Sequence, residues 1–488
     1  MVRRSFFLSF ADKATGLVLA LTTMAIVSRL MTPAQIGLFL VASSLVILVE
    51  ALRDFGIASF LIQDRDLTPE VTRCAATLIG LMSLGLGAVV VLGAGLASAV
   101  YEMPELGRLI RIAALAFLLA PISSPLLALM KRDMNFGAVT RIGISAAAVN
   151  AGVTIGLALA GFGPVSFAWG AVMAAATTAA GAVFCRPEWW IFRPTLRHWR
   201  RILPFGAWTT VVTLLGMLFD ATPRLILGRV LGFDAVGLLS RAVSLTQLPE
   251  RVILGAVPPV VLPALSQRVR ARLPIDTPYL LGMSLITAIQ WPALVCLALL
   301  SDPIVRLLLG PQWLEVIPLV RITALAAMLL APIYLTFPVL VSVGRMREMA
   351  LVSLVALPVS MAAVLIASRF GLTAVAWSLF PANAAYVLPL LVLVQRHVGF
   401  RWGELAGVAL RSAVVTSCAG MIPAAVLLAQ GTGPGLAGTA LAAAGAVAGW
   451  GAGLALSGHP LGAEIARLGG AARVGAAIRP RPAARRYQ

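Results

Sequence analysis

The 488-residue sequence is poor in charge. Asp, Glu, Lys and Arg make up 12% of it, against 60% hydrophobic residues. A water-soluble domain has about 25% charged and about 45–50% apolar residues, so this composition excludes a soluble globular fold, a coiled coil and a disordered chain. A bilayer-spanning helix needs about 20 apolar residues, and the hydrophobic positions suffice for roughly 14 such helices.

Cysteine and histidine are also scarce. The four cysteines lie far apart and form no CxxC pair, which argues against a disulfide framework and a metal site. All three histidines (His198, His397 and His459) fall in expected loops or in the tail, so we expect them at the surface. There is no Walker motif. We therefore expect no metal, no cofactor and no nucleotide.

Positive charge is abundant by comparison, with 38 Lys and Arg against 19 Asp and Glu and a net charge of +19. In a soluble protein this excess would indicate a nucleic-acid partner. In a polytopic membrane protein it is expected, because cytoplasmic loops collect Lys and Arg. We therefore expect no nucleic-acid partner.

The hydrophobic segments predict an all-α polytopic membrane protein with about 14 transmembrane helices. The segments lie near residues 10–30, 36–60, 74–98, 108–130, 139–160, 164–184, 204–228, 236–262, 278–300, 316–340, 349–368, 373–394, 409–429 and 435–456. Alternate connections carry about 26 and about 7 cations, which places both termini in the cytoplasm. Twelve helices are the alternative count.

The order of segments predicts five parts. A loop rich in Trp and Arg follows the sixth helix and divides the chain into two halves. The parts are an N-terminal lobe (1–184), a basic cytoplasmic linker (185–203), a C-terminal lobe (204–395), two further helices (396–456) and a basic, disordered tail (457–488). Gly445, Gly449 and Gly453 form a close-packing face in the last helix, within the monomer or against a partner helix.

The two lobes contain an internal repeat. The segment from Arg29 to Gly37 matches the segment from Arg229 to Gly237, with the same spacing between Arg and Gly. Further matches in the same order are 111–122 with 321–333 and 163–169 with 371–377. Both copies begin on the cytoplasmic side, so we expect a parallel repeat whose two lobes enclose a central cleft.

These residues resemble a known family. The segment 28–63, with its Arg29-Leu30 turn, Gly37, the Arg53–Ile57 motif and Gln63, is similar to the start of Wzx-type polysaccharide transporters. That family belongs to the multidrug/oligosaccharidyl-lipid/polysaccharide exporter (MOP) superfamily. A basic junction at 131–136 resembles it too, and the likeness extends over about the first 400 residues.

The resemblance implies a MATE-like fold: two pseudo-symmetric six-helix lobes around a central cation-lined cavity, plus two C-terminal helices. It implies a transporter and not an enzyme, in the bacterial inner membrane. The implied substrate is an undecaprenyl-pyrophosphate-linked oligosaccharide, flipped from the cytoplasmic to the periplasmic leaflet by alternating access. H⁺ or Na⁺ coupling and polysaccharide polymerase or export partners are also implied.

Ionisable residues inside the spans are the candidate functional residues, because charge within a bilayer is costly. Glu50, Arg53 and Asp54 share one helical face, and so do Asp220 and Arg224. Arginine binds phosphate in a bidentate manner. The expected substrate-binding residues are Arg53, Arg224 and Arg241, and the expected coupling or ion-pair residues are Glu50, Asp54, Asp220 and Lys13.

Secondary candidates lie nearer the helix ends or are uncharged: Arg29, Arg229, Glu250, Arg251 and Asn150. For all these residues a structural role stays open. The charged groups could form ion pairs that lock helices together, or arginines at helix ends could extend to the interface. Asn150 could form a hydrogen bond between helices.

Three other functions are alternatives to flipping. A MATE-type cation-coupled drug antiporter would require a net acidic cavity, which the buried arginines disfavour. A membrane-embedded polymerase or ligase of polysaccharide would require a large exterior loop, yet every expected exterior loop is short. A structural scaffold would not need charged residues within the spans.

Overall fold

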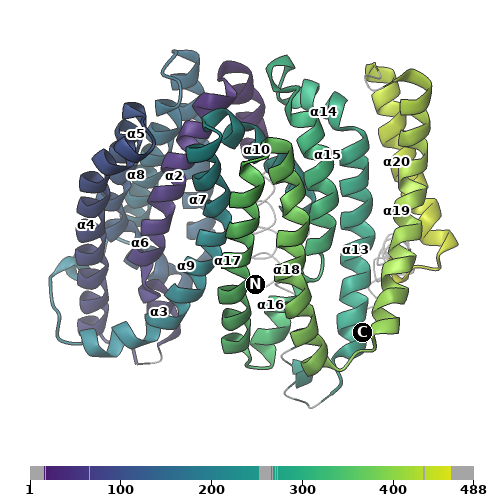
Figure 1. Cartoon of the computed structure of the whole chain (residues 1–488). Coiled ribbons are helices and arrows are strands. Elements are labelled where there is room, and N and C mark those ends of the chain that lie inside the picture. Colours follow the sequence, from purple (N-terminus) through teal and green to yellow (C-terminus); the bar gives the residue numbers. More distant parts are fainter. Residues whose placement is uncertain are drawn as a thin grey trace, which may run out of the picture. The chain divides into compact units, whose positions relative to one another are not determined.

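The computed structural model describes residues 16–462 except 17, 65, 252–264, 266, 270, 272 and 432–434. Lys13 and the tail from 463 lie outside the described residues, as does the side chain of Asp54. The described elements, shown in Figure 1, are helical. A helix over Val18–Leu30 comes first. It is followed by α2 (Pro33–Asp54), α3 (Ile57–Gln63), α4 (Pro69–Val100), α5 (Pro104–Ala114), α6 (Ala116–Arg132), α7 (Phe136–Leu159), α8 (Val165–Cys185), α9 (Trp199–Val230), α10 (Phe233–Thr246), α13 (Asp276–Leu299), α14 (Ser301–Leu308), α15 (Val316–Ala327), α16 (Ile333–Ser342), α17 (Met346–Ser368), α18 (Leu372–Val398), α19 (Trp402–Gln430) and α20 (Leu436–Leu456).

Local sequence sets the helix starts in the N-terminal half. The side chain of Thr32 accepts a hydrogen bond from the Gln35 backbone N–H, and the Gln35 side chain accepts one from the Thr32 backbone N–H. This capping box and Pro33 at the first position favour a helix start at that point. The same helix, α2, ends where Phe55 and Gly56 adopt positive φ values of 36° and 64°.

Eleven helices in the described part of the chain are long and apolar enough to cross a membrane. They coincide with eleven of the fourteen predicted spans. The other three predicted spans overlap the helix Val18–Leu30, α9 and α10. The prediction of an all-α polytopic membrane protein is thus confirmed.

The helices group into two compact units. One contains Met1–Leu245, Ile304–Thr323 and Arg347–Tyr386, and the other contains Thr246–Pro303, Ala324–Met346 and Val387–Gln488. Three of the boundaries between them pass through α14, α15 and α18, and the other two fall at the end of α10 and the start of α17. The predicted division into lobes (1–184 and 204–395), linker, extra helices and tail stays a prediction.

The first unit contains a reciprocal contact between the two copies of the repeat. A Cβ atom at Gly37 would overlap the carbonyl of Phe233, and one at Gly237 would overlap the carbonyl of Pro33. Pro33 and Phe233 are the first residues of α2 and α10. A two-fold relation requires such reciprocity, in which each copy touches the same point of the other.

A second pair of contacts repeats within the separate units. Pro121 in α6 has no N–H, so the carbonyl of Phe117 loses its helical partner, and the Ser83 hydroxyl donates to that carbonyl at 2.7 Å. Pro332 likewise has no N–H to offer the carbonyl of Met328, which accepts instead from Trp291 Nε1 at 3.0 Å and from the Ala331 N–H at 3.5 Å. Both donors come from the preceding long helix.

In the second unit α19 and α20 lie side by side (Figure 1). Cβ atoms at Gly445, Gly449 and Gly453 would collide with residues of α19, so this glycine face packs within the chain. Both helices also bond to α13: Thr287 Oγ1 lies 2.7 Å from Ser412 Oγ, and Trp450 Nε1 donates to the Ala288 carbonyl at 2.8 Å.

The prediction of a surface position for His459 was wrong. Its side chain is buried, with 2% of the residue exposed, and its Nε2 lies 2.8 Å from Ser284 Oγ. The cause is a reversal of the chain after α20, where Gly458 has a φ of 56° and the His459 N–H donates to the Leu454 carbonyl. This turn directs the imidazole toward α13.

Candidate substrate site

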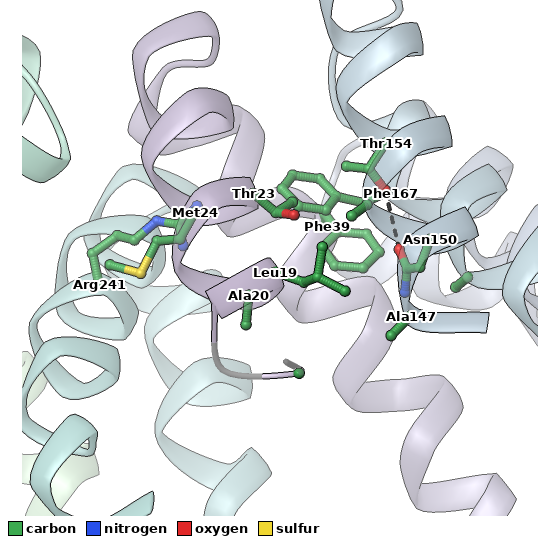
Figure 2. A pocket seen from close by; sticks show the side chains of 13 residues that line it. Leu19, Ala20, Thr23, Met24, Phe39, Ala147, Asn150, Thr154, Phe167 and Arg241 are labelled. Atoms are coloured by element: carbon green, nitrogen blue, oxygen red, sulfur yellow. Dashed lines mark hydrogen bonds between the residues drawn. The ribbon is translucent and has the colours of Figure 1, made fainter. Parts of the chain in front are cut away.

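Arg241 of α10 lines a cavity of about 350 Å³ in the first unit. The other walls come from the helix Val18–Leu30, α2, α7 and α8. Figure 2 shows Arg241 on one side, Asn150 and Phe167 on the other, and Leu19 and Thr23 between them. The cavity therefore joins a residue of the second repeat copy to helices of the first.

The charge of Arg241 has no carboxylate partner among the described residues. Its guanidinium lies 5.6 Å from the ring centroid of Trp313, a fully buried residue. Its Nε atom is buried and has no hydrogen-bond partner in the part of the chain that the structure describes, whereas the residue as a whole is half-buried. A buried N–H donor without an acceptor is costly, and an anion entering the cavity would supply the missing partner.

The opposite wall combines an amide with aromatic rings. Asn150 Oδ1 accepts a hydrogen bond from Thr154 Oγ1 at 3.1 Å. Gly170 of α8 allows the close approach, because a Cβ there would meet Thr154 Oγ1 and Asn150 Oδ1. Phe39 and Phe167 stack beside them with ring centroids 4.6 Å apart. The cavity thus offers a cation at one side and a mostly apolar wall at the other.

Glu50 and Arg53 line a different cavity of about 380 Å³. Arg53 Nη1 lies 3.3 Å from Glu50 Oε1, and its guanidinium lies 5.5 Å from the Phe117 ring centroid. Lys131 and the hydroxyl residues Ser124, Thr210 and Thr213 also line this cavity. The expected ion pair along α2 is therefore present, and Arg53 has a partner that Arg241 lacks.

Sequence reasoning missed Lys131 as a candidate site residue. It belongs to the basic junction 131–136, which the sequence placed in a cytoplasmic connection. The structure places it at the C-terminal end of α6, in the same cavity wall as Arg53. That Lys131 lines the same cavity as Arg53 depends on how α6 packs in the fold and could not be read from the sequence.

Asp220 and Arg224 lie one turn apart on α9, and their opposite charges interact. Neither residue lines the cavities of Arg241 and Arg53. Beside them, Phe219 packs on Tyr386 with ring centroids 5.2 Å apart. The three expected substrate arginines are thus not brought into one cavity by the described residues, and their role stays a prediction.

Arg29 and Arg229 lie at helix ends, where Arg29 contacts the last turn of α14 and Arg229 contacts the turn after α4. Arg29 Nη2 donates to the Leu307 carbonyl at 2.6 Å, and Arg229 Nη2 lies 3.1 Å from Glu102 Oε1. Both contacts hold a helix end, which favours the structural role for these two. Glu250 and Arg251 border the segment 252–264, which lies outside the described residues.

The segment after α14 forms hydrogen bonds with the end of the first helix. Trp313 Nε1 donates to the Ser28 carbonyl at 2.6 Å, and Gln312 Nε2 donates to the carbonyls of Ser28 and of Met31. The last carbonyls of a helix have no partner within it, so these side chains satisfy them. Trp313 therefore touches both the end of the first helix and the cation of the cavity.

Comparison with known proteins adds the family. A family model described as polysaccharide biosynthesis protein matches residues 26–318. The lipopolysaccharide biosynthesis protein WzxC of Escherichia coli (strain K12) is 28% identical over 323 residues, 64% of this chain and 64% of that protein. The succinoglycan biosynthesis transport protein ExoT of Rhizobium meliloti (strain 1021) is 25% identical over 350 residues, 70% of each chain. The chain therefore matches slightly less than two thirds of the length of WzxC.

Solved structures show the same fold at low identity. The lipid II flippase MurJ in its inward closed conformation has a TM-score of 0.75 at 12% identity, covering 92% of this chain and 97% of that one. An inward-facing MATE-family multidrug transporter of the MOP superfamily has a TM-score of 0.64 at 17% identity, covering 81% and 98%. These likenesses establish a MATE-like fold, and with the family model they show that this multi-pass membrane protein belongs to the polysaccharide biosynthesis protein family.

Proposed function

We propose that this protein flips undecaprenyl-pyrophosphate-linked oligosaccharide units from the cytoplasmic to the periplasmic leaflet of a bacterial inner membrane. Transport proceeds by alternating access and supplies exopolysaccharide, capsule or O-antigen synthesis. The protein acts as a transporter without catalysis, and both termini lie in the cytoplasm. The names of the relatives WzxC and ExoT and the MurJ-like fold support this proposal.

The observation that carries the proposal is the Arg241 guanidinium in the wall of a largely apolar cavity, where it has no carboxylate partner among the described residues. A lipid diphosphate has a strongly anionic head that must cross a medium in which charge is costly. A guanidinium that keeps its charge and binds phosphate oxygens in pairs lowers that cost. The same group repels organic cations, which weighs against a cation-coupled drug antiporter.

The cavity lined by Arg53 and Lys131 is a second place where the same anion could bind. Arg53 and Lys131 together carry two positive charges against one on Glu50. In the proposed orientation the end of α6 faces the cytoplasm, where the substrate is made. Glu50, Asp54, Asp220 and Lys13 are the proposed coupling or ion-pair residues, with H⁺ or Na⁺ as the coupling ion.

Complementation of a flippase-deficient strain tests the proposal. The parent restores surface polysaccharide, and Arg241→Ala reduces polymer output roughly tenfold or more, because one charge-assisted contact is worth that much. Arg241→Lys retains the charge without the bidentate geometry and falls between them. Arg369→Ala, at an exposed arginine in the α17–α18 turn, serves as the matched control.

Immunoblots of membranes ensure that equal amounts of each variant are compared. Full polymer output from Arg241→Ala at parental abundance would remove Arg241 from the substrate path. A parent that restores no polysaccharide in any flippase-deficient host would count against flipping itself.

A further inference from the structure

A third cavity lies on the outer surface of the first unit, between α4 and the α5–α6 pair. Its volume is about 400 Å³. Most of its wall is apolar and open: Leu84, Leu92 and Leu118 are 53%, 81% and 56% exposed. In a membrane protein such exposed leucines face lipid, so the cavity is a groove in the lipid-facing surface.

One charged residue lines this groove, Arg111 of α5. Its side chain is exposed and forms no salt bridge with the described residues. Its Nε donates to the Gly107 carbonyl one turn earlier at 3.2 Å. The guanidinium is therefore directed back toward the start of α5, and its terminal nitrogens remain available to a ligand.

The depth of Arg111 matches the headgroup level of one leaflet. The continuous stretch Pro104–Arg132 has 29 residues and is about 43 Å long, against about 30 Å of hydrocarbon. Arg111 lies about 10 Å along it, so with the stretch centred on the bilayer and perpendicular to it, the Cα of Arg111 is about 4 Å inside the hydrocarbon boundary. A side chain that turns back along the helix reaches the level of the lipid phosphates.

The rest of the groove runs from that level toward the bilayer midplane. On α4, which ends at Val100 on the same side, Leu92 is about 12 Å and Ser83 about 25 Å from the helix end. The Ser83 hydroxyl is already engaged by the Phe117 carbonyl. The groove thus has a cation at its shallow end and no available polar group at its deep end.

We propose that this groove binds one anionic phospholipid of the leaflet on the side of the 101–103 turn. The phosphodiester contacts Arg111, and an acyl chain lies along Leu84, Val91 and Leu118. A phosphodiester carries one negative charge, which a single arginine matches, whereas a diphosphate would require further cations. In the proposed orientation this leaflet is the periplasmic one. The lipid site itself does not depend on that orientation.

Native mass spectrometry of the purified full-length protein with phosphatidylglycerol tests this site. We expect one tightly retained lipid per chain and roughly tenfold weaker retention in Arg111→Ala. Arg108→Ala is the matched charge control, because Arg108 is exposed on the same helix but does not line the groove. Ala88→Phe should fill the groove while keeping Arg111, and Val89→Phe is its control outside the groove.

Equal retention of phosphatidylglycerol by all four variants would show a general layer of surrounding lipid and overturn the proposal. Preferential retention of farnesyl diphosphate at Arg111 would overturn the choice of occupant. The readout is lipid bound to purified protein, so a failure here leaves the polysaccharide complementation result untouched. A failure of complementation likewise leaves this lipid site standing.

Discussion

Trp313 contacts two neighbours, the guanidinium of Arg241 and the end of the first helix. The indole ring faces the guanidinium, and its N–H donates to the end of the first helix. A desolvated cation–π contact is worth about 2 kcal/mol or more, which offsets only part of the cost of burying the charge. The remaining cost keeps Arg241 receptive to an anion.

Trp313 variants separate its two contacts. Trp313→Phe keeps a ring beside Arg241 but loses the N–H, and it should destabilise the protein by only about 1 kcal/mol, because Gln312 still donates to the Ser28 carbonyl. Trp313→Ala also creates a cavity and should cost about 3–5 kcal/mol. Thermal unfolding in detergent measures both, with Trp377→Phe at an exposed tryptophan as control. Equal losses for Phe and Ala would show that the ring contributes nothing.

His459 predicts a pH dependence of stability. Burial lowers the pKa of its imidazole below the usual 6.5, and the charge of Arg411 lowers the pKa further. The folded protein therefore binds this proton less readily than the unfolded chain does. The stabilisation is fully present above pH 6.5 and is lost as the pH falls from about 6.5 toward the folded pKa.

Melting temperatures measured between pH 7.5 and pH 5 test this prediction. The parent should lose stability over that interval, and His459→Gln should show a flatter profile. His198→Gln, at an imidazole near Glu70 on the surface, is the control. Identical slopes for the parent and His459→Gln would assign the pH dependence to other groups.

At the scale of helices, the repeat explains why a proline is tolerated in the middle of a span. Pro121 and Pro332 each lack the N–H that would reach the carbonyl four residues earlier, and an unsatisfied polar group is costly inside the membrane. Ser83 and Trp291 supply the missing donors from the preceding long helix. The chemistry of the donor differs between the copies, but the position of the freed carbonyl is the same.

A double-mutant cycle tests this compensation. Ser83→Ala should destabilise the protein by about 1–3 kcal/mol, because the Phe117 carbonyl loses its donor. Pro121→Ala restores a backbone N–H that can reach this carbonyl, so the loss from Ser83→Ala should be smaller in the double variant. Thermal unfolding of the four proteins gives the coupling energy. Additive effects would mean that the hydroxyl and the proline act independently.

The sequence predicted the helices and the repeat because both depend on local patterns. Hydropathy locates the spans, and the matched Arg-to-Gly segments indicated the repeat, whereas the close contacts at Gly37 and Gly237 came from the structure. The sequence also singled out Arg241 and Asn150 as candidates, and the structure shows that both line one cavity. It could not show that Lys131 and Arg53 line the same cavity or that His459 turns toward α13, because both depend on how helices distant in the sequence pack together.

For the whole molecule, the decisive question is which sign of charge the interior accepts. Purified protein should be stabilised by farnesyl diphosphate and not by farnesol, since only the former offers phosphate oxygens to Arg241. A ligand at 100 times its Kd adds about 2.7 kcal/mol, enough for a clear rise in melting temperature. Arg241→Ala should lose most of this rise, whereas Arg369→Ala should keep it. A rise produced by an organic cation such as ethidium, with none from farnesyl diphosphate, would instead identify an exporter of cations.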